Sequence, residues 1–159
     1  MEATGAEGGA GRRAARPAKA PGFRSADEAR AVFDALLSSV DRDERAGGLL
    51  RAAAPRIRIE LTDLSLVVNL APADEPGRQL EWRFDDRTSR APRLRIAMDS
   101  GTANAYLQGR ESLAIAIARG RVRCDGDARA ALLYVPALKL LVEPYRRLLA
   151  ERFPHLLGD

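Results

Sequence analysis

The sequence has few of the residues that most often carry polar chemistry. It has one cysteine and one histidine in 159 residues, and aromatic residues make up 5%. A single cysteine excludes an internal disulfide and favours a reducing compartment. No run approaches the roughly 18 apolar residues of a membrane-spanning helix, and the N-terminus lacks the apolar core of a secretory signal. We therefore expect a cytoplasmic protein.

The net charge of +4 belongs mainly to the start of the chain. Residues 1–24 carry five basic and two acidic side chains, a net +3, which leaves +1 for the other 135 residues. Residues 1–22 are rich in Gly, Ala and Arg without apolar periodicity, so we expect a disordered leader. Loose contact of this leader with phosphate groups stays open. The folded domain is predicted over residues 25–153, with a C-terminal tail at 154–159.

Residues 25–53 show the spacing of helices. Ser25 and Glu28 form a capping box, in which each side chain satisfies a backbone amide at the start of a helix. A second, short helix is predicted over residues 44–53, although Gly47 and Gly48 weaken it. In the first helix, apolar residues recur on one face, namely Ala29, Val32, Phe33, Leu36, Leu37 and Val40.

Further along the chain, apolar and polar residues alternate with a period of two. Such alternation gives each strand one apolar and one wet face, which is typical of a largely antiparallel sheet covered on one side. The sequence therefore predicts an α+β fold, a five-stranded, mostly antiparallel sheet with helices covering one face. The alternating segments are residues 57–61, 65–70, 79–85, 93–99 and 121–125.

The helices that cover the sheet are predicted after residue 99. Two short ones are rich in small residues, and Ser100 or Thr102 is expected to cap the first. The segment 127–153 is the most apolar of the chain and is predicted to be a long helix. Because Pro136 and Pro144 each lack an amide donor, we expect kinks or a break into two helices.

The stretch ARGRVRCDGD raises the question of polar chemistry. A catalytic cysteine needs a base and a positively charged setting for its thiolate, and the single histidine, His155, lies near the chain end. Asp125 and Asp127 resemble a metal-binding pair, but such metals need several further oxygen ligands. We interpret Cys124 as a buried strand residue, Gly126 as a turn and Asp127 as a helix N-cap. No catalytic residue, metal site or cofactor is predicted.

Arginines are also expected on the outer face of the sheet, where nucleic acid could meet them. They are interleaved with acidic residues, and this face lacks aromatic side chains on which bases could stack. A solvated, charge-balanced face is therefore favoured over a nucleic-acid platform. These arginines are Arg58, Arg83, Arg95, Arg121 and Arg123.

An excess of apolar residues remains to be explained. One sheet face and the last helix are strongly apolar, and the two helices between them carry small residues. Large residues above and below small ones pack as a solid core, or they surround a dry cavity that holds a hydrophobic ligand. The pattern by itself leaves both readings open. The small residues are Ala103, Ala105, Ala114, Ala116 and Ala118.

The element order and one motif resemble the sterol carrier protein-2 family. The order is two helices, three strands, a fourth strand, two helices, a fifth strand and a long apolar helix. The motif GRVRCDGD, from Gly120 to Asp127, is similar to the family's run of glycine, basic, aliphatic, basic, two variable positions, glycine and aspartate. Gln108-Gly109-Arg110 resembles its helix-loop glycine. The similarity covers about residues 25–153.

The resemblance implies a sheet and helices that enclose an apolar tunnel for a lipid, with no catalytic residues. Family members bind fatty acyl chains, sterols or other lipids, and related domains serve as accessory proteins for isoprenoid quinone synthesis. The C-terminus here, His-Leu-Leu-Gly-Asp, departs from the peroxisomal signal of the eukaryotic carriers. The arginine-rich leader is not a feature of the family either.

We therefore predict a non-catalytic protein that binds and transfers a hydrophobic ligand. Each methylene of the ligand that leaves water should contribute about 0.8 kcal/mol to the free energy of binding. The expected partners are a lipid or acyl-chain ligand and, transiently, a membrane surface or an enzyme, with no specific nucleic acid. The alternative is a protein-interaction or accessory module of a lipid or quinone biosynthesis complex, and nucleic-acid binding is less favoured. The predicted cavity lining is Trp82, Phe84, Met98, Leu107, Ile117, Leu138, Leu141 and Tyr145.

Overall fold

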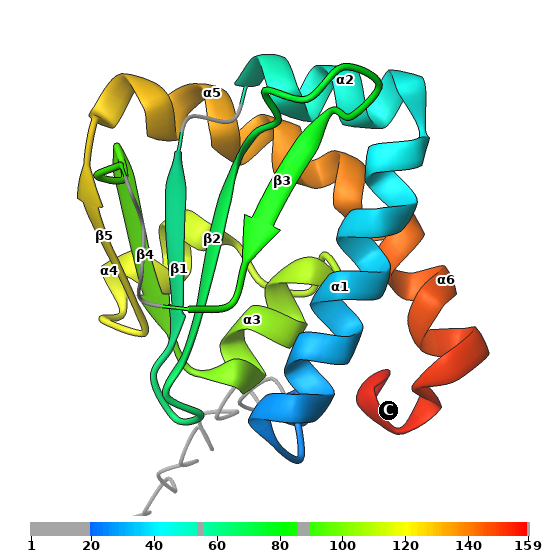
Figure 1. Cartoon of the computed structure of the whole chain (residues 1–159). Helices are drawn as coiled ribbons and strands as arrows, with labels where there is room; N and C mark the ends of the chain where they lie inside the picture. The colour runs from blue at the N-terminus through cyan, green and yellow to red at the C-terminus, as the bar shows by residue number, and fades with distance from the viewer. Residues whose placement is uncertain (1–19, 54–55, 86–89, 159) are drawn as a thin grey trace, which may run out of the picture.

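A five-stranded sheet in the order β3-β2-β1-β4-β5 forms the centre of the molecule (Figure 1). The computed structural model describes residues 20–53, 56–85 and 90–158. Within these residues the predicted strands form close to their expected positions. They are β1 (Ile57–Leu61), β2 (Leu66–Pro72), β3 (Leu80–Arg83), β4 (Leu94–Met98) and β5 (Val122–Gly126).

The pairing confirms a mostly antiparallel sheet with one parallel pair. β1 pairs antiparallel with β2, β2 with β3, and β4 with β5. β1 and β4 are parallel, with Ile57 opposite Leu94 and Leu61 opposite Met98. After β3, at one edge of the sheet, the chain returns to pair β4 with the free side of β1, which makes β1 the central strand.

Helices cover one face of this sheet, as Figure 1 shows behind the strands. The predicted α+β layering is therefore confirmed, and the apolar strand faces are buried against the helices because that removes their surface from water. The helices are α1 (Ala26–Arg42), α2 (Glu44–Ala53), α3 (Ser100–Leu107), α4 (Leu113–Ala118), α5 (Ala128–Leu138), η1 (Lys139–Leu141), α6 (Val142–Arg152) and η2 (Pro154–Leu156).

The long apolar segment breaks into two helices, as its prolines predict. α5 ends at Leu138, and the single 3₁₀ turn η1 leads into α6. Pro136 lies inside α5, where its nitrogen has no hydrogen to donate to the carbonyl of Leu132. Pro144 lies in the first turn of α6, where an amide would have no helical acceptor in any case. The break turns α6 onto a different course from α5.

Two glycines are explained by close approach of the backbone. A Cβ at Gly47 would lie 2.6 Å from the carbonyl oxygen of Val40, so α2 packs against the end of α1 only with glycine there. Gly126 has a φ of +123°, and a Cβ there would lie 2.2 Å from the carbonyl oxygen of Arg93. Asp127 caps α5 as predicted, accepting from the amides of Arg129 and Ala130.

The predicted cap of α3 is wrong. Asp99 is the N-cap, and its side chain accepts a hydrogen bond from the amide of Thr102 at 2.8 Å. Ser100 is fully buried, and its hydroxyl donates to Asp63 at 2.6 Å instead. Asp99 directly follows β4, so α3 begins one residue earlier than a Ser100 cap would allow.

A buried polar cluster ties the two ends of the described chain to α3. Asn104 is fully buried, and its amide nitrogen donates to the carbonyls of Pro21 and Leu156, both at 2.8 Å. Its oxygen accepts from Gln108 Nε2 and from the hydroxyl of Tyr145, again at 2.8 Å. Residues 1–19 of the expected leader lie outside the described residues, and the proposed division into leader, domain and tail stays a prediction.

Candidate functional site

An apolar cavity lies between the sheet and the helices. Its floor comes from the inner faces of β1, β2 and β4, and its roof comes from α1, α3, the start of α4, α5 and η1. The lining residues on the sheet are Ile59, Val68, Leu70, Ile96 and Met98. Those on the helices are Phe33, Leu36, Leu37, Ala103, Tyr106, Leu107, Leu113, Tyr134, Leu138 and Leu141.

Two tyrosines are the polar members of this lining, and both stay neutral near physiological pH. Burial raises the pKa of Tyr106 to about 12. Burial, together with the proximity of Tyr106, raises the pKa of Tyr134 still further. Tyrosines whose pKa values are raised in this way hold their protons, so they are poor bases and poor nucleophiles at neutral pH. What this arrangement does offer is a place for hydrocarbon out of water.

The cavity is small in this conformation, with a volume of about 50 Å³. An engineered apolar cavity of about 150 Å³ holds benzene, and sites that enclose drug-sized ligands reach ~300–1,000 Å³. In volume, the cavity therefore lies between a solid core and the open tunnel that the resemblance implies. In this conformation the cavity is too small to enclose a lipid chain.

Four of the eight predicted lining residues meet at this cavity. Met98 lies on β4, Leu107 on α3, Leu138 at the end of α5 and Leu141 in η1, and each is at least nine-tenths buried. They come from four separate elements of the fold, and the sheet register and the break after α5 bring them together. Their contact with a ligand stays a prediction.

The other four predicted residues lie elsewhere. The indole of Trp82 donates to Asp34 on α1 at 2.9 Å, and the Arg78 guanidinium lies 5.3 Å from its ring centre. Ile117 is 42% exposed on α4. Phe84 follows the end of β3 and packs at the margin of the core. Tyr145 is buried in the Asn104 cluster on α6, beyond the break that the prolines cause.

None of the other eleven lining residues was assigned to the site from the sequence. Phe33, Leu36 and Leu37 were recognised as the apolar stripe of a helix, which is the signal that could have found them. That stripe does not reveal which part of the sheet the helix covers. Tyr106 and Tyr134 were missed, whereas Tyr145, the tyrosine that was assigned to the lining, lies outside it.

The stretch ARGRVRCDGD contains β5 and the N-cap of α5, and Gly126 is the last residue of the strand rather than a turn. Cys124 is partly buried against the core, and burial, together with the nearby Asp125 charge, raises the pKa of its thiol. Asp127 pairs with Arg93 at 2.6 Å in addition to capping α5, and both contacts lower the pKa of its carboxyl. In the part of the chain that the structure describes, no three His, Cys, Asp or Glu residues gather as metal ligands would.

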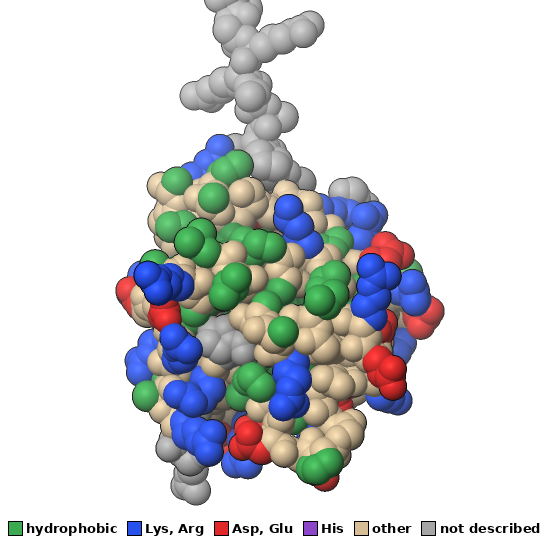
Figure 2. Space-filling model, turned by 90° about the horizontal axis from the view of Figure 1, so that it is seen from above, with side chains coloured by type: hydrophobic (Ala, Val, Ile, Leu, Met, Phe, Trp, Pro, Cys, Tyr) green, Lys and Arg blue, Asp and Glu red, His purple; other side chains and the backbone are tan. Residues whose placement is uncertain are grey.

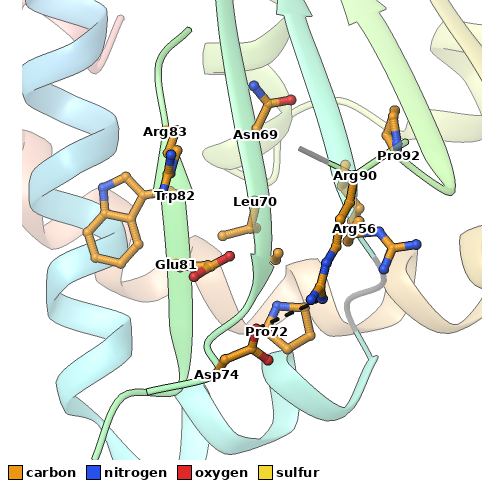
Figure 3. A pocket seen from close by; sticks show the side chains of 12 residues that line it. Arg56, Asn69, Leu70, Pro72, Asp74, Glu81, Trp82, Arg83, Arg90 and Pro92 are labelled. Atoms are coloured by element: carbon orange, nitrogen blue, oxygen red, sulfur yellow. Dashed lines mark ion pairs between the residues drawn. The ribbon is translucent and has the colours of Figure 1, made fainter. Parts of the chain in front are cut away.

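A larger depression, about 410 Å³ in volume, lies on the outer face of β2 and β3. Figure 3 shows its charged side chains spread along the strands, with the Trp82 indole turned toward α1. Arg90 and Asp74 form the ion pair drawn there, at 3.9 Å and largely in solvent. Arginines and carboxylates alternate around the depression, as in the solvated, charge-balanced face that the sequence predicts. Exposed pairs of this kind contribute little binding energy.

None of the helices among the described residues is long and apolar enough to cross a bilayer. No protein-family model matches the sequence, and neither does any curated protein. The comparison with solved structures does find similar folds.

Three solved structures show what the fold resembles. A ubiquinone synthesis protein, UbiJ-SCP2, aligns with a TM-score of 0.54 at 17% identity, over 71% of this chain and 90% of its own. Sterol carrier protein 2 from Yarrowia lipolytica, in its apo form, aligns with a TM-score of 0.51 at 11% identity, over 69% and 88%. Part of the sec-alkylsulfatase Pisa1 from Pseudomonas sp. aligns with a TM-score of 0.52 at 21% identity.

The architecture is therefore an α+β sheet with a one-sided helical layer around an apolar centre, and its fold is that of sterol carrier protein 2. The fold predicted from element order and from GRVRCDGD is confirmed. This chain covers most of UbiJ-SCP2 and most of the Yarrowia lipolytica protein. In contrast, 69% of it aligns with only 15% of the sulfatase chain. At these identities, the likeness establishes the fold.

Proposed function

We propose that the protein binds the hydrocarbon part of a lipid between its sheet and its helical layer and transfers it without catalysis. The observation that carries the proposal is the uncharged apolar cavity at the centre of a sterol carrier protein-2 fold. Each methylene that leaves water for such a site contributes about 0.8 kcal/mol. A chain of several methylenes therefore gains enough to be held reversibly.

The lipid requires more room than the cavity of about 50 Å³ provides. The segment α5–η1 is the wall best suited to move, because Pro136 removes one hydrogen bond inside α5 and the 3₁₀ turn interrupts the helix just beyond it. Its inner side meets the cavity through the apolar side chains of Leu138 and Leu141 and through Tyr134. An incoming acyl or isoprenoid chain replaces such contacts with similar ones as the wall yields.

Native mass spectrometry of the freshly purified protein, followed by denaturing extraction, tests the proposal. Leu138→Trp fills the cavity with an indole ring. The control is Ile115→Trp, which makes a comparable enlargement on α4 at a side chain that is 49% exposed. We expect a co-purifying lipid on the wild-type protein and on Ile115→Trp, and at least a ten-fold lower occupancy on Leu138→Trp. Overpacking destabilises by about 1–3 kcal/mol, so thermal unfolding must show that both variants remain folded. Equal lipid occupancy in both folded variants would show that the lipid does not bind in this cavity.

A second candidate is an accessory role in isoprenoid quinone synthesis, favoured by the likeness to UbiJ-SCP2. The extracted lipid separates the two. An isoprenoid quinone or its precursor supports the accessory role, whereas fatty acids or sterols support general lipid transfer. A wild-type protein that carries no lipid, and takes up none from added fatty acid or quinone, would favour a protein-interaction module instead.

A further inference from the structure

The outer side of α5 exposes apolar side chains where a surface helix normally carries polar ones. Leu132 is 75% exposed and Leu133 is 64% exposed. Residues three or four apart are neighbours on a helix surface, so both leucines lie on one face with Arg129, which is one turn before them. On the same face Pro136 and Lys139 lie one and two turns after the leucines. Adjacent exposed leucines are unusual, because burying such side chains away from water lowers the free energy of the protein.

α2 extends this apolar surface. α2 packs against α5 at the end of the molecule drawn uppermost in Figure 1. Leu49 on α2 is 49% exposed, and Arg45 precedes it by one helical turn. Figure 2 looks onto this end and shows apolar side chains across it, with Lys and Arg side chains between and around them. We call Leu49, Leu132 and Leu133, with Arg45, Arg129 and Lys139, the α2–α5 face.

The charge of the α2–α5 face is of one sign along α5. No acidic residue occurs from position 128 to position 142, although 30% of the chain is charged. Among the described residues, neither Arg129 nor Lys139 has an ion-pair partner. At 1.5 Å per residue the two cations stand about 15 Å apart along the axis, with the leucines between them. The pattern is an apolar patch held between two positive charges.

We propose that the α2–α5 face docks on the surface of an anionic lipid bilayer. Leucines that enter the acyl boundary and cations that meet anionic headgroups are the two contributions by which interfacial helices bind membranes. A protein partner would need acidic groups facing both ends of α5 around an apolar centre. The bilayer supplies both features everywhere on its surface.

The docked orientation places the cavity next to its source of lipid. Tyr134 and Leu138 on the inner side of α5 line the cavity, while Leu132 and Leu133 on the outer side face the bilayer. One helix, about 10 Å thick, then separates the cavity from the membrane. Docking does not require that the cavity be occupied, so it is tested separately from lipid binding.

Co-sedimentation of the full-length protein with vesicles tests this face. The probes are vesicles of phosphatidylglycerol mixed with phosphatidylcholine, and vesicles of phosphatidylcholine alone. The variant Leu132→Gln/Leu133→Gln removes the apolar patch while retaining residues that favour helix. The matched control is Ile115→Gln/Ile117→Gln, which makes the same change at the exposed side chains of α4. The basic residues of positions 1–24 are the same in all three proteins.

We expect the wild-type protein and the α4 control to bind the anionic vesicles, and the α5 double variant to bind at least ten-fold less. Binding to phosphatidylcholine alone should be weaker, and Arg129→Gln/Lys139→Gln should weaken binding to the anionic vesicles. High salt should also weaken it, since the Debye length falls to about 3 Å at 1 M. Equal vesicle binding by both double variants would overturn the proposal, as would the absence of wild-type binding. Self-association that only the α5 variant abolishes, without vesicle binding, would assign the face to a second copy of the chain.

Docking and the proposed function fail in different ways. Leu138→Trp changes the inner side of α5, so it should lose co-purifying lipid and retain vesicle binding. Leu132→Gln/Leu133→Gln should lose vesicle binding and retain the capacity to take up a fatty acid added in solution. Loss of both properties in both variants, with intact secondary structure, would refute the separate roles of the two sides.

Discussion

The Asn104 cluster provides the sharpest test of how this fold is held together. The side chain of Asn104 uses all of its hydrogen-bonding capacity, donating to the carbonyls of Pro21 and Leu156 and accepting from Gln108 and Tyr145. Asn104→Ala deletes four hydrogen bonds, of which three are buried and the one to Pro21 is partly buried. It also leaves the hydroxyl of Tyr145, a fully buried residue, without the acceptor it has in this structure.

The magnitude follows from these contacts. Each hydrogen bond contributes a net ~0.5–1.5 kcal/mol, and a buried group left unpaired costs about 1–3 kcal/mol. The Gln108 amide still donates to the Leu156 carbonyl at 2.9 Å, which limits the loss there. We therefore expect Asn104→Ala to lower the free energy of unfolding by about 3–5 kcal/mol, a large part of the ~5–15 kcal/mol of a typical domain. Tyr145→Phe removes one bond only and should cost about 1 kcal/mol.

Urea unfolding followed by the fluorescence of the single tryptophan, Trp82, measures these changes. Asn69→Ala is the matched control, because its side chain donates one hydrogen bond, to the Asp85 carbonyl, and its buried oxygen has no partner among the described residues. We expect its loss to be about 1 kcal/mol. If Asn104→Ala and Asn69→Ala differ by less than about 1 kcal/mol at equal m-values, the cluster does not anchor the chain ends as argued.

Two further predictions concern titration and reactivity. All three tyrosines have raised pKa values because they are buried, with Tyr106 at about 12 against an ordinary 10.0. The folded state thus retains protons that the unfolded state releases, so stability falls as pH rises above about 10, and tyrosinate absorbance should appear together with loss of circular dichroism. Tyrosinate absorbance at pH 10 with intact circular dichroism would contradict this. The Cys124 thiol should react with iodoacetamide at pH 8 more slowly than a free cysteine and accelerate in urea, since burial raises its pKa above the ordinary 9.0. A faster reaction in the folded protein would indicate an activated thiol.

Local patterns in the sequence determined the elements of this fold. Alternation located the five strands because a strand with one buried face repeats every two residues. The stripe from Ala29 to Val40 located α1, and Asp127 was identified as the cap of α5 because an aspartate before an apolar run satisfies free amides. The break near Pro136 also followed from the chain alone. Each of these features depends on neighbours within a few residues.

Only the tertiary structure decided which apolar residues surround the cavity. Met98 and Leu138 meet there, whereas Trp82, equally apolar and on the same sheet face, turns to a hydrogen bond with Asp34. The fate of Asn104 was equally out of reach, since its partners lie 83 and 52 residues away in the chain. The volume of the cavity is the small difference between two large volumes, that enclosed by the layers and that filled by the side chains, so the sequence pattern does not determine it. Periodicity gives the face on which a residue lies, and long-range packing decides what that face meets.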